Sequence, residues 1–120
     1  MNIKRCAVVA GAAVLAVVAS TATAHAVDIS AKTPYLSGGR IYATGTLYGP
    51  NPPTKVCVSL LASHPASPDV PIATECKTIY GGDVTASASN FCGSYTTFIS
   101  VERDGKTLRV QKSSSTAICH

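Results

Sequence analysis

His64 has the neighbours that hydrolytic chemistry would require. It lies in a proline-rich stretch with Asp69 and several serines close by. A serine nucleophile, a histidine base and an aspartate form a catalytic set when they lie within hydrogen-bonding reach of one another. The alternative is an exposed loop histidine, which we favour because loops of this composition are usually connections. The acidic residues are scattered along the chain, and we predict no catalytic residues and no enzyme activity.

Two tyrosines, Tyr42 and Tyr48, are candidates for a binding surface. They lie on one face of an alternating segment, together with Thr44 and Thr46. A flat face of tyrosine rings and hydroxyl groups can bind a sugar or a protein. Ordinary strand packing, or a face covered by other elements, explains the same pattern because tyrosine is common in strands. We favour this second interpretation and keep Tyr42 and Tyr48 as candidate binding residues; the predicted partner of the domain is an unknown extracellular protein or carbohydrate.

Residues 1–26 have the pattern of a cleaved signal peptide. Two basic residues precede an apolar run, which is shorter than the ~20 residues that a membrane helix needs. Small residues follow, with Ala24 and Ala26 in the spacing that signal peptidase accepts. An uncleaved membrane anchor is the alternative. Cleavage after Ala26, or else after Ala24, predicts a secreted, extracellular domain (27–120) without stable membrane insertion.

The charge of this predicted domain argues against nucleic acid as a partner. Two of the ten Lys and Arg residues lie in the signal segment, so eight basic and six acidic side chains remain, without a basic cluster. The domain is also small, and a core of this size is marginal unless cross-links support it.

Four of the five cysteines follow the signal segment: Cys57, Cys76, Cys92 and Cys119. An even number of cysteines in a short exported chain predicts disulfides. A zinc site is the alternative, but the chain has no C-x-x-C pair and its spacings differ from those of structural zinc sites. We therefore predict two disulfides, no metal and no cofactor.

The elements that must position these residues are strands, because apolar and polar residues alternate and no helical period persists. The predicted extended segments are 27–37, 40–48, 54–63, 72–80, 84–91 and two strands within 91–120, with a loop at 64–71. Gly45 predicts a bulge or the close approach of a neighbour. About seven short strands predict a single all-β domain, an immunoglobulin-like β-sandwich.

Hairpin symmetry gives a preference among the three possible disulfide connectivities. Opposed residues in a hairpin have numbers with a constant sum, so the midpoint of a pair falls at the turn. The midpoint of Cys57 and Cys76 lies in the proline-rich loop, which predicts Cys57–Cys76 and places Leu61 opposite Ile72.

The midpoint of Cys92 and Cys119 lies between Gly105 and Lys106. A Gly-X pair suits a type II′ turn, and this register predicts Cys92–Cys119. It also places Val101 opposite Val110, with Leu108 on the same core-facing side. The alternative turn, Asp104-Gly105 of type I′, would place Cys92 opposite Ala117 and would need a bulge in Ser113–Ser115 to restore the pair.

The late motif Cys92-Gly93-Ser94-Tyr95 and the terminal Cys119 carry a resemblance to a family. The chain resembles the small exported two-disulfide immunoglobulin-like β-sandwich proteins of Gram-positive bacteria, which are mostly uncharacterised. The resemblance covers most of the predicted domain. It implies a non-catalytic extracellular binding or structural module of unknown ligand.

A second resemblance is to the secreted subtilisin-inhibitor-like family, in size, export and disulfides between neighbouring cysteines. It implies a protease inhibitor whose reactive loop surrounds the third cysteine, Cys92, with Gly93, Ser94 and Tyr95 near the scissile bond. The chain departs from that family in two respects. Segment 77–91 reads as turn and strand where the family has a helix, and the proline-containing reactive loop is missing.

Overall fold

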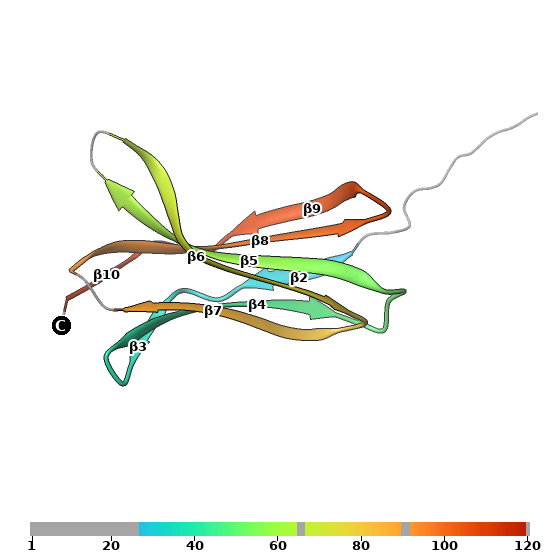
Figure 1. The fold of residues 1–120 in the computed structure, drawn as a ribbon, viewed down its shortest axis with the longest axis horizontal. Coiled ribbons are helices and arrows are strands. Elements are labelled where there is room, and N and C mark those ends of the chain that lie inside the picture. The colour runs from blue at the N-terminus through green and yellow to red at the C-terminus, as the bar shows by residue number, and fades with distance from the viewer. Residues whose placement is uncertain (1–26, 65–66, 90–91, 120) are drawn as a thin grey trace, which may run out of the picture.

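The chain folds into two packed β-sheets, as a computed structural model shows (Figure 1). The structure describes residues 27–64, 67–89 and 92–119. In these ranges the fold is all-β, without helix, and the predicted all-β sandwich is confirmed. The predicted signal peptide, residues 1–26, lies outside the described residues.

Nine strands in the described residues build the two sheets. They are β2 (Asp28–Ala31), β3 (Tyr35–Ser37), β4 (Arg40–Tyr48), β5 (Thr54–His64), β6 (Ser67–Ile79), β7 (Gly82–Ser89), β8 (Gly93–Arg103), β9 (Lys106–Lys112) and β10 (Thr116–Ile118).

The nine strands fill seven lateral positions, because two positions are each shared by two short strands. In the smaller sheet, β2 and β3 both pair with one edge of β4, and β7 pairs with its other edge. In the larger sheet the order is β6, β5, β8, and then β9 and β10, which both pair with β8. All of these pairings are antiparallel, as expected for strands joined by short turns.

The core lies between the sheets and follows the alternation of each strand. In β4 the apolar positions are buried and the tyrosine and threonine positions are half-buried or exposed, as a strand with one buried face requires. The largest fully buried apolar side chains are Ile41, Leu47, Leu60, Ile99, Val56, Val58, Val84 and Val101. Gly45 allows the close approach that the sequence predicted, because a Cβ atom there would lie 2.8 Å from Ile99 Cδ1 and from Val58 Cγ2.

Both predicted disulfides are confirmed, Cys57–Cys76 and Cys92–Cys119. Cys57 and Cys76 lie directly opposite each other on β5 and β6. Cys92 and Cys119 adjoin the ends of β8 and β10, whose last paired residues are Gly93 and Ile118. Each bond therefore ties an edge strand of the larger sheet to a central strand.

The preferred turn of the second hairpin is wrong. Arg103 pairs with Lys106, and Asp104 and Gly105 both have positive φ, 53° and 76°. This is the type I′ geometry that matches the twist of the flanking strands. Two irregularities then restore the Cys92–Cys119 register: a bulge at Leu108, between the pairs Glu102–Thr107 and Val101–Arg109, and the unpaired 113–115 segment.

The bulge also changes which residues of β9 face the core. Val101 lies opposite Arg109 instead of Val110. Leu108 and Val110 are 39% and 52% exposed, so the predicted core-facing side of this strand is wrong. A one-residue shift moves side chains to the other face of a strand, because the side-chain period is two.

The predicted loop at 64–71 is mostly strand. β6 begins at Ser67 and continues through Pro68 and Pro71. Proline is tolerated here because β6 is an edge strand, where an N–H can be missing without breaking a ladder. A register shift between Leu60 and Leu61 places Leu61 opposite Pro71 instead of the predicted Ile72.

The β8–β9 turn provides a first prediction. Gly105→Ala is expected to cost about 1–2 kcal/mol in the free energy of unfolding, because an alanine pays that amount in the left-handed region. A Cβ there meets nothing within 4 Å, so backbone strain alone would account for the loss. Urea unfolding measures it, with Asp104→Asn as the control that tolerates the same conformation. An unchanged midpoint for Gly105→Ala would contradict the turn assignment.

Candidate functional site

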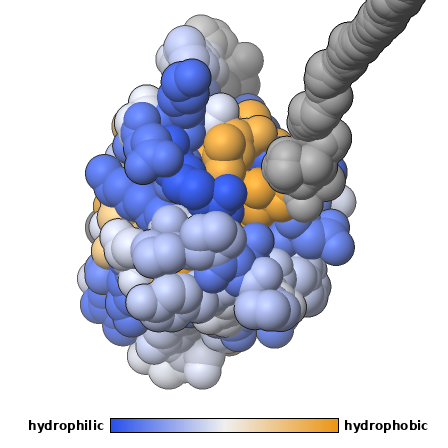
Figure 2. Space-filling view, turned by 90° about the vertical axis from the view of Figure 1, so that its right-hand side faces the viewer, coloured by the Kyte–Doolittle hydropathy of each residue, from blue (hydrophilic) through white to orange (hydrophobic). Residues whose placement is uncertain are grey.

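The surface of the sandwich includes a turn end and the outer faces of the two sheets. The turns after β4, β6 and β8 lie together at one end (Figure 1). Figure 2 shows this end as mostly hydrophilic, with one compact apolar area. The two outer sheet faces carry the predicted tyrosine pair and a groove, and they are the candidate sites.

The outer face of the smaller sheet carries the predicted pair Tyr42 and Tyr48, both on β4. Tyr42 stacks on Tyr35 of β3, with ring centroids 5.5 Å apart and planes inclined by 22°. The ammonium group of Lys32 lies 4.9 Å from the centroid of the Tyr35 ring. Tyr48 is 54% exposed, and its hydroxyl lies 3.1 Å from Ser30 Oγ of β2. Tyrosine rings thus stand near both ends of β4.

Hydroxyl groups lie between the two tyrosines on this face. The Thr44 and Thr85 hydroxyls lie 2.9 Å apart, and Thr46 donates a hydrogen bond to Asp83 Oδ1 at 2.7 Å. These pairs join β4 to β7, whose outward residues stand directly opposite those of β4. We call this surface, made of Tyr35, Tyr42, Thr44, Thr46, Tyr48, Asp83 and Thr85, the tyrosine face. None of the described strands packs over it, since these strands form two layers and the face points away from the other layer.

The outer face of the larger sheet is hollowed into a groove of about 640 Å³. Two register shifts in the β5–β6 pairing bend the distal part of that hairpin, which turns away from the smaller sheet in Figure 1. The bent part of β6 forms one wall of the groove. The lining residues are Ser59, Leu61, Ser67, Pro68, Asp69, Pro71, Phe98 and Lys112.

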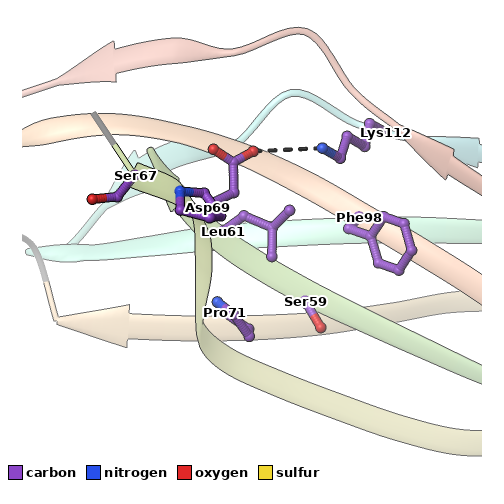
Figure 3. A pocket seen from close by; sticks show the side chains of 8 residues that line it. Ser59, Leu61, Ser67, Asp69, Pro71, Phe98 and Lys112 are labelled. Atoms are coloured by element: carbon purple, nitrogen blue, oxygen red, sulfur yellow. Dashed lines mark ion pairs between the residues drawn. The ribbon is translucent and has the colours of Figure 1, made fainter. Parts of the chain in front are cut away.

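An ion pair crosses from β6 to β9 at the groove. Lys112 Nζ lies 3.5 Å from Asp69 Oδ2, and Ser63 Oγ donates a hydrogen bond to Asp69 Oδ1 at 3.1 Å. Figure 3 shows this pair along one side of the groove, with Leu61 and Phe98 beside it. Leu61 is only 8% exposed although it belongs to the outer face. The groove therefore combines an apolar floor with one cation and one anion.

The structure brings together part of the set suggested around His64. Asp69 contacts Ser63, but its other oxygen is engaged by Lys112. His64 ends β5 opposite Ser67, and its side chain is outside the described part. All four cysteines of residues 27–119 are in disulfides, so they offer no thiol nucleophile there.

The candidate reactive loop, Gly93, Ser94 and Tyr95, is part of β8. These residues pair with β10 on one side, and Ser94 and Tyr95 pair with β5 on the other. Tyr95 is buried in the core. The protruding loop that an inhibitor of the subtilisin type requires is therefore not formed by these three residues, because the disulfide next to them closes a strand pair.

The groove was missed at the sequence level, although one of its residues carried a signal. Ile99 and Val101 face the core, so alternation places the intervening Ser100 and the preceding Phe98 outward. An outward phenylalanine on a central strand needs cover or a ligand. The contact between Asp69 and Lys112 could not be predicted from the sequence, because it depends on β-bulges that the alternation of apolar and polar residues does not reveal.

Two further observations limit the chemistry of the described ranges, 27–64, 67–89 and 92–119. No three His, Cys, Asp or Glu residues lie close enough there to hold a metal ion. No helix in them is long and apolar enough to cross a membrane.

No family model, curated protein or solved structure matches the chain.

Proposed function

We propose that this protein is a secreted, non-catalytic binding module whose tyrosine face binds an extended polysaccharide. The observation that carries the proposal is the uncovered outer face of the smaller sheet, with tyrosines near both ends of β4 and hydroxyls between them. Export is supported by the signal-like residues 1–26 and by two disulfides, which persist in oxidising compartments.

The spacing of the tyrosines favours a long ligand. Tyr42 and Tyr48 are separated by six residues of one strand, which corresponds to roughly 20 Å. A sugar chain lying along β4 would meet an aromatic ring at each end and hydroxyl groups between them. Each threonine hydroxyl has one proton and two lone pairs, so it keeps hydrogen-bonding capacity beyond its contact within the sheet.

The composition of the face supports binding without catalysis. Strands β2, β3, β4 and β7 contain no histidine or cysteine, and Asp83 already accepts a hydrogen bond from Thr46. The alternative, a protease inhibitor of the subtilisin-inhibitor-like type, has less support because Gly93–Tyr95 is held within a sheet.

The proposed fold family is the immunoglobulin-like sandwich. Its support is the arrangement of seven lateral positions, three in one sheet and four in the other, with β4 and β5 in different sheets. The resemblance to exported proteins with a late C-G-x-Y motif, here at Cys92–Tyr95, agrees with this assignment.

Retention on insoluble polysaccharides tests the proposed function. The mature protein should deplete from solution onto at least one of cellulose, chitin and peptidoglycan. Tyr42→Ala and Tyr48→Ala should each weaken retention about tenfold, because truncation of an aromatic anchor typically costs more than ~1 kcal/mol.

Tyr80→Ala is the matched control for this experiment. Tyr80 is 65% exposed but follows β6, outside the tyrosine face. Thermal unfolding of each variant separates lost binding from lost folding, which matters most for the half-buried Tyr42. Equal retention of Tyr48→Ala and Tyr80→Ala, or no retention of the unmodified protein on any of the three, would refute the tyrosine face as the site.

A further inference from the structure

We propose that the groove on the larger sheet is a second binding site, for a small amphiphilic anion with an apolar body and one negative charge. The groove lies on the outer face of the opposite sheet from the tyrosine face, so this proposal does not depend on the polysaccharide. Its volume, about 640 Å³, falls within the range of ~300–1,000 Å³ typical of small-molecule sites.

The floor of the groove supplies the apolar contact. Leu61 from β5 and Phe98 from β8 lie on the same outer face, and Pro68 and Pro71 of the bent β6 add apolar wall. Proline fixes φ near −65°, so this wall loses little conformational entropy when a ligand binds. A preorganised apolar site of this kind gains affinity because less ordering is required on binding.

Lys112 supplies the positive charge. Its side chain is 56% exposed, against 31% for Asp69. An ammonium group has three protons to donate, and the ion pair with Asp69 accounts for one. Because an exposed ion pair is typically worth only ~0–1 kcal/mol, a ligand anion can replace Asp69 at Lys112 at low cost.

The surroundings of Asp69 explain why the favoured ligand is an anion and not a cation. Both oxygens of Asp69 are engaged, Oδ1 by Ser63 and Oδ2 by Lys112. When a ligand takes over Lys112, Asp69 keeps its hydrogen bond from Ser63. A ligand cation would have to displace Lys112 from an already satisfied carboxylate, whereas the ammonium group of Lys112 has protons left for a ligand anion.

Binding of 8-anilinonaphthalene-1-sulfonate, which has an aromatic body and one sulfonate, tests the site in the disulfide-intact protein. Its fluorescence should rise on binding, and sodium dodecanoate should displace it. Phe98→Ala should raise the Kd about tenfold, because it removes part of the apolar floor, and Lys112→Gln should raise it about two- to fivefold, because an exposed ion pair is worth at most ~1 kcal/mol. Asp69→Asn should lower the Kd about two- to fivefold, since it removes the internal competitor, whose ion pair is worth at most ~1 kcal/mol.

Lys55→Gln is the matched control, because it removes a positive charge from the same strand face as Ser59 without touching the groove. Lys112 is largely exposed, so Lys112→Gln is expected to fold normally, and a thermal unfolding scan verifies this. The proposal is overturned if Lys112→Gln and Lys55→Gln bind the probe equally. It is also overturned if Asp69→Asn weakens binding, because removal of a competitor for Lys112 cannot weaken an anion that binds Lys112.

Discussion

Replacing Cys57 and Cys76 together by serine is expected to lower the free energy of unfolding by about 3 kcal/mol. The bond closes a chain segment of 19 residues, and the chain-entropy model gives about this value for such a loop. The loss is large against the total stability of ~5–15 kcal/mol that single domains have. For a domain of this size it corresponds to a fall of roughly 12–24 °C in Tm, which circular dichroism during heating measures.

The second disulfide provides an internal comparison. Cys92 and Cys119 are separated by 27 residues, so the paired Cys92→Ser, Cys119→Ser variant should lose slightly more, about 3.5 kcal/mol. The double substitutions leave no unpaired thiol of the broken bond to form a wrong one. Losses below about 0.5 kcal/mol for both pairs, the range of ordinary surface changes, would show that packing alone holds the sandwich together.

The disulfides were predicted correctly because each cysteine pair joins the corresponding ends of two hairpin strands, where the residue numbers of opposed positions have a nearly constant sum. In the second hairpin the sum is not constant: it rises from the turn to the cysteine pair through two irregularities. The β8–β9 turn lies at Asp104-Gly105 instead of Gly105-Lys106, and the bulge at Leu108 with the unpaired 113–115 segment returns the chain to the same end pairing. The Cys92–Cys119 pairing was therefore predicted correctly although the position of the turn was predicted wrongly.

The β4 strand was predictable for a different reason. Its nine residues alternate without interruption, and both its bounds and its two faces follow the sequence pattern. The tyrosine face could thus be expected, although its stacking on Tyr35 could not, because that contact depends on β3 joining the same edge of β4 as β2.

The groove could not be predicted from the local sequence pattern. Prolines at 68 and 71 are typical of a loop, yet both lie in an edge strand, where tertiary context removes the usual penalty. The register shift after Leu60 then bends this strand so that Asp69 reaches Lys112 of β9. Such a contact joins residues far apart in the sequence and requires the two bulges to be known.

Gly45→Val is expected to destabilise the protein by about 3 kcal/mol, in spite of the opposite trend in strand propensity. Glycine within a strand costs ~0.5–1 kcal/mol relative to alanine, so local preference alone predicts stabilisation. However, a Cβ at this position would lie 2.8 Å from both Ile99 Cδ1 and Val58 Cγ2. Overpacking of this kind typically costs ~1–3 kcal/mol, sometimes more, and it outweighs the gain.

A double-mutant cycle distinguishes close sheet packing from a general intolerance of valine at this position. Ile99→Ala alone should cost about 2–5 kcal/mol, because it leaves a cavity in the core. In the double variant Gly45→Val, Ile99→Ala the numbers of added and removed carbon atoms are equal, and the valine side chain can occupy the cavity left by Ile99. The double variant should therefore be more stable than the sum of the single losses by about 1–3 kcal/mol, as measured by urea unfolding. Additive losses would mean that the contact with Val58 of β5, which Ile99→Ala leaves in place, limits the space at Gly45. A stabilised Gly45→Val would mean that the sheets lie farther apart at this point.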